Sequence, residues 1–441
     1  MFPQKRRTRV LAVVTASTLL ALTAACSSGG GDQEANDDGT PSGELTVLTW
    51  RTDLVEDGTF DEYVEQFKAK YPEVTDVTVE GVTDYEGTVK TRMNTEDYGD
   101  VLAIPGSVTP DQLPDFFEPL GDQAEMEKEY RWLNDKSFEG KSYGIPVVGN
   151  VQGVVYNKRV WEEAGITEFP TTPQEFLDDL QAVKDKGIAV APLYTNYKDA
   201  WALSQWEGWR GAVTANPDYV NEMTQTDTPW TEESDSGVID GTIYDVVAQG
   251  LTEADPTTTD WEGSKRLLGV GDISAMVLGS WSIPQMQAAA EAAGADPADI
   301  AYMPTPSQVD GKFHTVAGGD YNLGINVHSK NKATARAWID WFNHESGFSE
   351  AQVGLSPLID GPVPAALEGF MAEVELITMN PAPEGKESLF ADIDTASGIV
   401  TTDPKYRQQI IDDARSGART KEQIFDDLNS RWAEGRADAG A

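Results

Sequence analysis

Two stretches of the chain interrupt strand-like apolar runs with glycine, amide and acidic residues. Residues 143–158 read YGIPVVGNVQGVVYNK, in which valines flank two glycines and two amides. Valine runs are typical of strands buried on both faces, whereas glycine inside a strand marks a bend or a close approach to the backbone. We therefore predict a strand that leaves one packed unit, crosses open space and enters a second. One long bulged strand is the alternative.

A second stretch repeats this pattern later in the chain. Residues 315–327, TVAGGDYNLGINV, again place glycines and polar residues between apolar ones. We predict that this segment is the return strand, and we expect a third passage near residues 355–364. Several crossings between two packed units would form a hinge and the floor of a cleft.

Strands and helices alternate on both sides of the first crossing. Strand patterns occupy residues 45–50, 77–82 and 100–105, and apolar residues at helical spacing predict a helix that ends before Pro72. After the crossing, a capping box at Thr172 opens another helix, and a strand follows at residues 188–193. Because the α/β pattern restarts, the sequence predicts a second lobe. A further capping box, at residues 420–423, opens the last helix.

Polar residues follow two of the first strands directly. Ligands of parallel α/β sheets sit beyond the carboxyl ends of strands. Arg51, Asp53, Asp84 and Tyr85 are therefore expected on the ligand-facing edge. Solvated loop residues are the alternative for each of them.

The middle of the chain is rich in tryptophan. Trp201 and Trp206 are too far apart for one helical stripe, and Trp281 ends an apolar strand. Aromatic faces can stack on a sugar ring in a concave site whose polar groups bond the hydroxyls. We expect these three residues at such a site. Core packing is the main expectation for Trp209, Trp230 and Trp261.

Charge and missing motifs narrow the function. The chain carries 74 acidic and 33 basic side chains, with a formal net charge of −41, which argues against nucleic acid or an anionic membrane as a direct ligand. The three histidines have no metal-binding spacing, and no dinucleotide or phosphate loop is present. We predict no metal, no cofactor and no catalytic residue.

The N-terminus has the pattern of an export signal. A basic start and an apolar run precede a lone cysteine, Cys26. We predict a signal peptide over residues 1–25, a lipid on Cys26 and a flexible tether over residues 26–43, so that the folded body begins near Glu44. An ordinary signal peptide with an incidental cysteine is the alternative. A single cysteine permits no disulfide within the chain.

From about Glu44 to the C-terminus the chain resembles the family 1 extracellular solute-binding proteins of ABC importers, the class of maltose-binding protein. The resemblance rests on the lipoprotein-like start, on GIP leading to VYNK at residues 144–158, on residues 275–281, and on residues 318–332 with the tryptophan-rich helix that follows. It implies a periplasmic-binding-protein-like II fold: two α/β lobes joined by crossing hinge segments, with a ligand cleft between them.

The resemblance also implies roles for individual residues. Arg51 and Asp53 match a loop that hydrogen-bonds the ligand, and Asn150 matches a polar sugar contact six places before Tyr156. Further matches are Tyr194 and Asn196 in an aromatic-bearing loop, Trp281 as the stacking tryptophan, and Gly319 and Asp320 on the return strand. The chain departs from some relatives at residues 100–104, where an aromatic is missing.

We expect a monomeric receptor, tethered to the outer face of the cell membrane, that captures a carbohydrate and delivers it to an ABC permease. Lobe 1 is predicted over residues 44–150 and 325–360, and lobe 2 over residues 151–324 and 361–441. The rival hypotheses are a lipid-anchored glycoside hydrolase, which needs two carboxylates facing each other across the cleft, and a binding protein for a non-sugar solute such as a glycerophosphodiester.

Overall fold

The computed structural model describes residues 39–441, so the predicted signal peptide and Cys26 lie outside the described residues. The first strand starts at Gly43, next to Glu44, near which the folded body is expected to begin. The backbone N–H of Ser42 donates to Oγ1 of Thr334 at 2.8 Å, so residue 42 already contacts the first lobe. The tether boundary near residue 43 stays a prediction.

Lobe 1 contains a four-stranded sheet in the order β13-β3-β1-β2. β1 pairs in parallel with β2 and β3, whereas β13 is antiparallel to β3. A small three-stranded sheet, β4-β6-β5, lies beside it. The elements of this lobe are β1 (Gly43–Thr49), α1 (Thr52–Glu56), α2 (Thr59–Lys70), β2 (Val74–Gly81), α3 (Tyr85–Arg92), β3 (Val101–Ala103), η1 (Pro110–Gln112), α4 (Leu113–Phe116), β4 (Gly121–Asp122), α5 (Gln123–Met126), η2 (Asn134–Lys136), β5 (Ser137–Phe138), β6 (Lys141–Ser142), β13 (Leu323–Ile325), α12 (Lys332–His344) and α13 (Phe348–Ala351).

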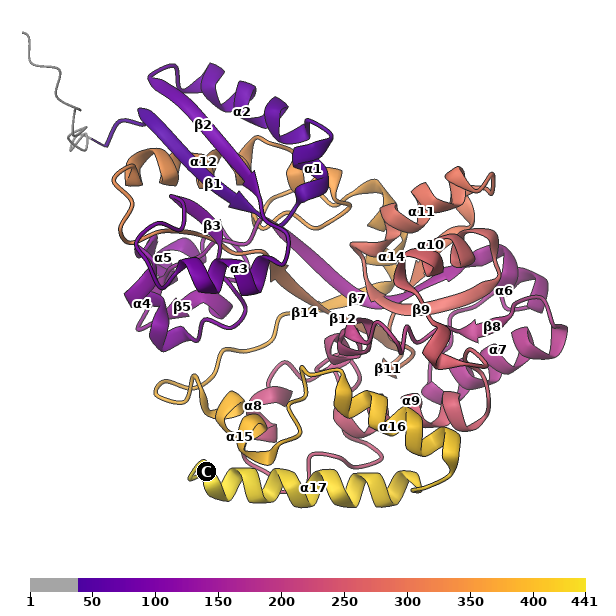
Figure 1. The fold of residues 1–441 in the computed structure, drawn as a ribbon. Coiled ribbons are helices and arrows are strands. Elements are labelled where there is room, and N and C mark those ends of the chain that lie inside the picture. Colours follow the sequence, from indigo (N-terminus) through magenta and orange to yellow (C-terminus); the bar gives the residue numbers. More distant parts are fainter. Residues whose placement is uncertain (1–38) are drawn as a thin grey trace, which may run out of the picture.

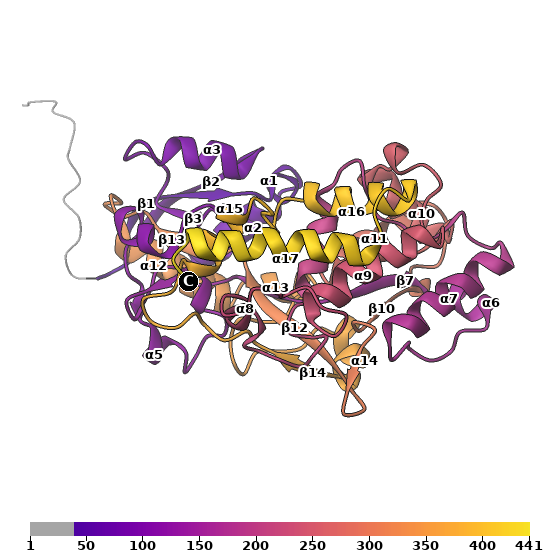
Figure 2. The ribbon, with the colours of Figure 1, turned by 90° about the horizontal axis from the view of Figure 1, so that it is seen from below.

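Lobe 2 is built on a seven-stranded sheet with the path β11-β12-β7-β9-β8, to which β10 and β14 add. Three C-terminal helices, α15 to α17, lie together on one side of the molecule (Figures 1 and 2). The elements of this lobe are β7 (Val148–Asn157), α6 (Lys158–Ala164), α7 (Pro173–Lys186), β8 (Ala191–Leu193), η3 (Trp201–Trp209), α8 (Tyr219–Met223), α9 (Asp235–Ala248), η4 (Pro256–Thr258), α10 (Trp261–Val270), β9 (Ile273–Gly279), α11 (Ser282–Ala292), η5 (Pro297–Asp299), β10 (Ile300–Met303), β11 (Gln308–Val309), β12 (Lys312–Asp320), α14 (Ala365–Glu373), β14 (Val374–Ile377), α15 (Leu389–Ser397), α16 (Lys405–Ser416) and α17 (Lys421–Asp438).

The predicted crossing strands are β7 and β12, which pass between the lobes in Figure 1. They pair antiparallel from Val148 with Asp320 to Val151 with Ala317. The third passage is also present, since Leu355 and Gly149 exchange two backbone hydrogen bonds of 2.7 Å. Leu323 pairs with Ala103 of lobe 1, so the return to lobe 1 begins two residues before the predicted boundary at 325.

The hinge glycines are required by close neighbours. A Cβ added at Gly149 would lie 2.2 Å from the indole of Trp132, and one at Gly153 would lie 2.4 Å from the carbonyl oxygen of Met303. Both distances are far below van der Waals contact. The interrupted valine run therefore marks places where other groups press against the backbone, as predicted.

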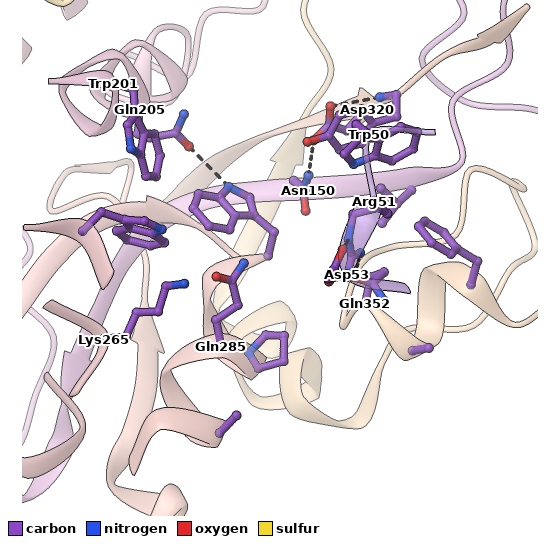
Figure 3. A pocket seen from close by; sticks show the side chains of 18 of the residues that line it. Trp50, Arg51, Asp53, Asn150, Trp201, Gln205, Lys265, Gln285, Asp320 and Gln352 are labelled. Carbon is purple, nitrogen blue, oxygen red and sulfur yellow. Dashed lines mark hydrogen bonds and ion pairs between the residues drawn. The ribbon is translucent and has the colours of Figure 1, made fainter. Parts of the chain in front are cut away.

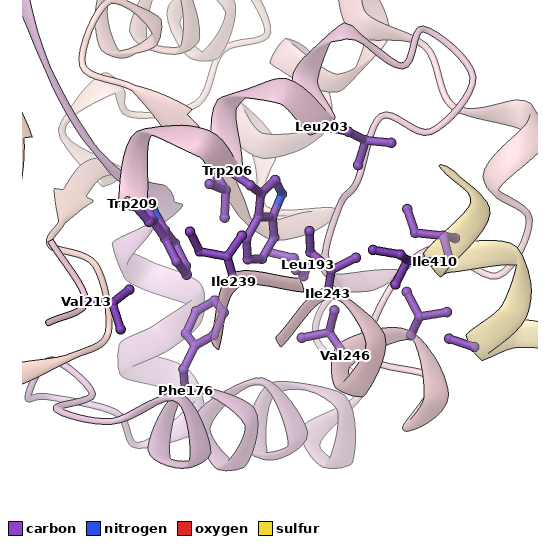
Figure 4. Packing of buried hydrophobic residues seen from close by; sticks show 14 of the residues in the cluster. Phe176, Leu193, Leu203, Trp206, Trp209, Val213, Ile239, Ile243, Val246 and Ile410 are labelled. Carbon is purple, nitrogen blue, oxygen red and sulfur yellow. The ribbon is translucent and has the colours of Figure 1, made fainter. Parts of the chain in front are cut away.

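The hydrophobic residues pack mainly within the lobes. In lobe 1, one cluster joins the sheet to α2 and α12. In lobe 2, the largest cluster runs from α7 across η3 and α9 to α16 and α17 (Figure 4). Trp209, Trp230 and Trp432 are almost fully buried in it, which confirms the core prediction for the first two. No helix among residues 39–441 is long and apolar enough to span a membrane.

Both capping boxes open helices, with a difference between them. At α17, Thr420 and Gln423 bond each other's backbone N–H, at 3.3 and 3.0 Å, so this box is complete. At α7, Thr172 accepts from the N–H of Glu175 at 3.1 Å, but the Glu175 carboxylate accepts from Thr171. The helix starts are predicted correctly, although the second half of the first box is replaced by a bond one residue earlier.

Candidate functional site

A cavity of about 810 Å³ lies between the lobes at the hinge (Figure 3). This volume falls within the range of about 300–1,000 Å³ that is usual for small-molecule sites. Its walls come from both lobes and its floor from the crossing strands. The lining residues are Trp50, Arg51, Asp53, Val148, Asn150, Trp201, Gln205, Trp261, Glu262, Lys265, Trp281, Pro284, Gln285, Ala288, Asp320, Tyr321, Phe348, Ala351 and Gln352.

Three tryptophans form the wall on lobe 2. Trp201 opens η3, Trp261 opens α10, and Trp281 lies between β9 and α11. The ring centroids of Trp201 and Trp261 are 4.8 Å apart, and each lies 5.8 Å from Trp281. All three are only half-buried, so indole surface faces the cavity. Such a wall suits the apolar face of a ring-shaped ligand.

Polar groups accompany this aromatic wall. The indole N–H of Trp281 donates to Oε1 of Gln205 at 3.4 Å, which links the end of β9 to η3. Lys265 bonds both oxygens of Glu262 at 2.9 Å, and its Nζ lies 4.9 Å from the Trp261 ring centroid. The lysine charge is therefore already balanced within α10.

The wall on lobe 1 is polar where β1 passes into α1. Nε of Arg51 donates to Oδ1 of Asp53 at 2.8 Å, and Nη2 donates to Oδ2 at 2.6 Å. This bidentate pairing holds the pKa of Asp53 below its usual value. Arg51 also donates to Gln352, which follows α13. The loop after the first strand is thus tied to the segment that follows α13.

An aromatic pair lies next to this polar wall. The rings of Trp50 and Tyr321 stack with centroids 3.5 Å apart and planes 12° from parallel. Tyr321 has φ 52°, a left-handed conformation uncommon for a bulky residue, at the turn between β12 and β13. Tyr85 packs edge-on against Trp50 and donates its hydroxyl to the carbonyl of Ala103 at 3.0 Å. Tyr85 therefore braces the pair and does not line the cavity.

The floor is an amide–carboxylate pair on the crossing strands. Nδ2 of Asn150 donates to Oδ2 of Asp320 at 3.0 Å, and the backbone N–H of Tyr321 donates to Oδ1 at 2.9 Å. Burial raises the pKa of Asp320 to about 6, because these two bonds only partly offset the loss of hydration. Oδ1 of Asn150 is buried and has no partner within the protein, which leaves an acceptor for a ligand hydroxyl or water.

Six of the residues predicted from the sequence meet at this cavity: Arg51, Asp53, Asn150, Trp201, Trp281 and Asp320. They come from both lobes and from both hinge strands. Their convergence is a structural observation, and their contact with a ligand remains a prediction.

Besides Tyr85, five predicted residues do not line the cavity. Trp206 is 3% exposed and packs against Trp209, so it belongs to the core. Gly319 faces the opposite side of β12 from Asp320, since an added Cβ would meet Pro146 at 2.7 Å. Asp84 is an exposed residue just before α3.

Tyr194 and Asn196 are held within lobe 2. The Tyr194 hydroxyl accepts from the N–H of Asp260 at 3.2 Å, which places it behind the start of α10. Asn196 is fully buried with φ 55°, and its carbonyl accepts from Ala200. Both residues shape the approach to η3 and lie outside the cavity lining.

Several lining residues are not predicted from the sequence. Trp50 immediately precedes Arg51, so the rule that places Arg51 at the ligand-facing edge of the sheet also applies to Trp50. Trp261 is expected in the core, but it follows the capping residue Asp260 at the first turn of α10 and lines the cavity. Phe348 begins α13 and Gln352 directly follows it, and no local pattern marks either residue.

A second, larger cavity of about 1,310 Å³ also lies between the lobes. It is lined by residues from the β4–β6 region of lobe 1 and by residues around α8 and 379–390 of lobe 2. Among its described lining residues there is no tryptophan and no lysine or arginine. It includes no residue of β7 or β12, so the smaller cavity is the better candidate site.

Comparisons with known proteins agree with this geometry. The family model of the bacterial extracellular solute-binding proteins matches residues 51–346. A mannobiose-bound binding protein of an ABC transporter from Bifidobacterium animalis subsp. lactis is 36% identical with a TM-score of 0.83, covering 92% of this chain and 98% of that one.

Two further relatives are similar. A manno-oligosaccharide-specific solute-binding protein from the same organism, solved with mannotriose, is 35% identical with a TM-score of 0.82 and covers 92% of this chain and 97% of that one. The multiple sugar-binding protein of Streptococcus mutans is 22% identical over 335 residues, which is 73% of this chain and 74% of that protein.

Proposed function

Because the chain belongs to the bacterial extracellular solute-binding proteins, we propose that it captures a carbohydrate outside the cytoplasm and delivers it to the permease of an ABC importer. The observation that carries this proposal is the wall of three tryptophans facing the polar hinge floor across the cavity. Indoles stack on the C–H face of a pyranose, while amides and carboxylates bond its hydroxyls.

The charges that line the cavity favour a neutral ligand. Both cations, Arg51 and Lys265, are ion-paired, with Asp53 and Glu262 respectively. Asp320 is the remaining carboxylate among the described lining residues. An anionic solute such as a glycerophosphodiester would find no unpaired cation at this cavity and would face a carboxylate. The non-sugar alternative is therefore the weaker one.

A glycoside hydrolase would need two carboxylates with divided roles, one proton donor and one nucleophile or base. Asp320, with its raised pKa, could donate a proton, but Asp53 and Glu262 are each engaged by a cation. The relatives described above are binding proteins. We propose a receptor that releases its ligand unchanged.

Binding would close the lobes if the sugar touches both of them. A ligand shifts a conformational equilibrium only by its differential affinity for the two states. A sugar stacked on Trp281 and bonded to Arg51 and Asn150 would contact lobe 2, lobe 1 and the hinge at once. The closed monomer would then present a joined surface to the permease.

Isothermal titration calorimetry against a panel of sugars tests the ligand class. Mannobiose and mannotriose come first, since two of the similar solved structures described above contain them. Raffinose, chitobiose and glycerophosphocholine serve as comparison ligands. Saturable heat with a sugar and intact sugar recovered afterwards is the expected result. Binding of glycerophosphocholine alone, or recovery of cleaved sugar, would reject the proposal.

The lipid anchor needs a separate test, since Cys26 lies outside the described residues. We propose that Cys26 carries the lipid that holds the receptor at the outer face of the cell membrane. Substituting Cys26→Ser should release the receptor into the medium with its sugar binding unchanged. A variant that stays in the membrane fraction would contradict the anchor.

A further inference from the structure

The segment that carries Trp201 into the cavity has an unusual conformation. η3 runs for nine residues, Trp201–Trp209, as a 3-10 helix. Such helices seldom exceed three or four residues, because their hydrogen bonds are poorly aligned and side chains three apart eclipse each other. A run of this length therefore needs support from outside the helix.

One face of η3 obtains support from the hydrophobic core. With three residues per turn, Leu203, Trp206 and Trp209 share a face, and all three are at most 3% exposed (Figure 4). Trp201 and Gln205 lie on other faces and line the cavity. Core packing fixes one side of the helix, but by itself it permits small slides along and rotations about the axis.

A buried arginine from α16 bonds the same helix at two points. Nη1 of Arg407 donates to the carbonyl of Leu203 at 3.1 Å, and Nη2 donates to Oε1 of Glu207 at 2.6 Å. Arg407 is 1% exposed. These two bonds lie four residues apart on η3, slightly more than one turn, and bracket Gln205. A planar guanidinium held this way sets both the height and the rotation of the helix.

The arginine is itself held in place. Its Nε donates to Oδ1 of Asp240 on α9 at 3.1 Å. Asp240 also accepts from the indole N–H of Trp230 at 2.7 Å and from the Tyr406 hydroxyl at 2.6 Å. Because every member has partners, the network can be rigid although it is buried. A buried ion pair is weak evidence for stability, which leaves positioning as its more natural role.

We propose that Arg407 is a positioning residue of the sugar site. It fixes the register of η3, and through η3 it sets where Trp201 and Gln205 meet Trp261 and Trp281. The C-terminal helices, which lie beyond the region matched by the family model, thereby become part of the ligand-binding apparatus. This inference rests on the proposed function for its ligand but not for its geometry.

The test compares two arginine-to-lysine substitutions, one on α16 and one in the turn between α16 and α17. Arg407→Lys keeps the charge but cannot bond Leu203, Glu207 and Asp240 together. Arg419→Lys is the matched control, because Arg419 pairs with Asp413 and Asp427 and makes no bond to η3. Mannotriose titration should show about tenfold weaker binding for Arg407→Lys and no change for Arg419→Lys.

A double-mutant cycle separates positioning from general destabilisation. In a Trp201→Ala, Gln205→Ala background, Arg407→Lys should change mannotriose affinity by less than twofold, since the groups it positions are gone. An undiminished tenfold loss in that background, or wild-type affinity for the single variant, would overturn the proposal. If Arg407→Lys does not fold, Glu207→Gln removes the charged contact of Arg407 with η3 and also the ion pair between Glu207 and Arg210, and it is judged by the same criteria.

A readout without ligand keeps this inference distinct from the proposed function. Indoles in contact give a circular dichroism band in the near ultraviolet. Trp201→Phe should remove the contribution of Trp201 to this band. Arg407→Lys should lose the same band, and Arg419→Lys should keep it. If no sugar binds the wild-type protein, the proposed function fails, while this spectrum still decides whether Arg407 positions η3. An unchanged Arg407→Lys spectrum would reject positioning.

Discussion

The two walls of the cavity are built on different principles. On lobe 2, three indoles from three elements contact one another, and η3 behind them is fixed by a buried polar network. On lobe 1, an ion pair and an amide, Arg51, Asp53 and Gln352, lie beside the stacked rings of Trp50 and Tyr321. The wall on lobe 2 has the larger aromatic surface, and the wall on lobe 1 adds a charged hydrogen-bonding group.

This difference assigns different tasks to the lobes. Burial of apolar surface is non-directional, so a sugar would rest first on the aromatic wall of lobe 2. Hydrogen bonds to charged groups depend strongly on geometry, so the contacts of lobe 1 would form only on closure and would choose among sugars. Lobe 2 should therefore dominate affinity, and lobe 1 should dominate selectivity.

The largest loss of affinity is expected when the Trp281 indole is removed from the wall on lobe 2. Trp281→Ala should weaken sugar binding by about 2 kcal/mol, or roughly thirtyfold, because it deletes the ring that touches both Trp201 and Trp261. Calorimetry with the best-binding sugar measures the loss. Trp338→Phe is the control, since Trp338 is buried in the core of lobe 1. It should lower thermal stability without changing affinity, and equal affinity losses in the two variants would refute a stacking role for Trp281.

A smaller effect is expected from the polar wall. Arg51→Met removes the donors on lobe 1 and frees the Asp53 carboxylate, whose pKa should return towards its usual value. We expect about tenfold weaker binding, the scale for a lost hydrogen bond to a charged group, with a larger spread among sugars than in Trp281→Ala. Titration of three sugars against both variants gives the comparison. A uniform loss across the sugars would remove the selectivity argument for lobe 1.

The hinge floor predicts a dependence on pH. Burial raises the pKa of Asp320 to about 6, above its value in an unfolded chain, so ionisation costs folding free energy as the pH rises through that range. Sugar hydroxyls that donate to the carboxylate favour the ionised form. Affinity should therefore fall as the pH drops from 7 to 5, by up to about tenfold if the ionised form alone binds. Asp320→Asn should flatten this profile, and a profile that stays equally steep would assign the effect to another group.

The hinge and the central tryptophan could be predicted from the sequence because their signals are local. Glycine and amide residues inside a valine run can be recognised without knowledge of the tertiary structure. Gly149 is an example, because the close approach of Trp132 leaves room only for glycine at this position. Trp281 was found because it directly follows an apolar strand. In both cases the prediction depends only on residues that are neighbours in the sequence.

Several predicted residues lie outside the cavity lining because a local pattern does not indicate which face of an element the core covers. Trp206 shares the buried face of η3 with Leu203 and Trp209, whereas Trp201 lies on another face. Gly319 and Asp320 are neighbours on a strand, so they point to opposite sides. Gln352 reaches the cavity only because the chain has returned to lobe 1 through β12 and β13, and no pattern near Gln352 indicates its place at the cavity.

The smallest change in affinity is expected for Asp84→Asn, which tests where the polar wall of lobe 1 ends. Asp84 follows a strand of lobe 1 just as Arg51 does, yet it is exposed before α3 and outside the cavity lining. Asp84→Asn preserves a side chain that tolerates the observed φ of 49°, so stability should change by less than about 0.5 kcal/mol. Sugar affinity should stay within twofold of wild type. If Asp84→Asn instead weakened binding as much as Arg51→Met, α3 would have to move towards the ligand on closure, and the wall of lobe 1 would extend beyond the first strand.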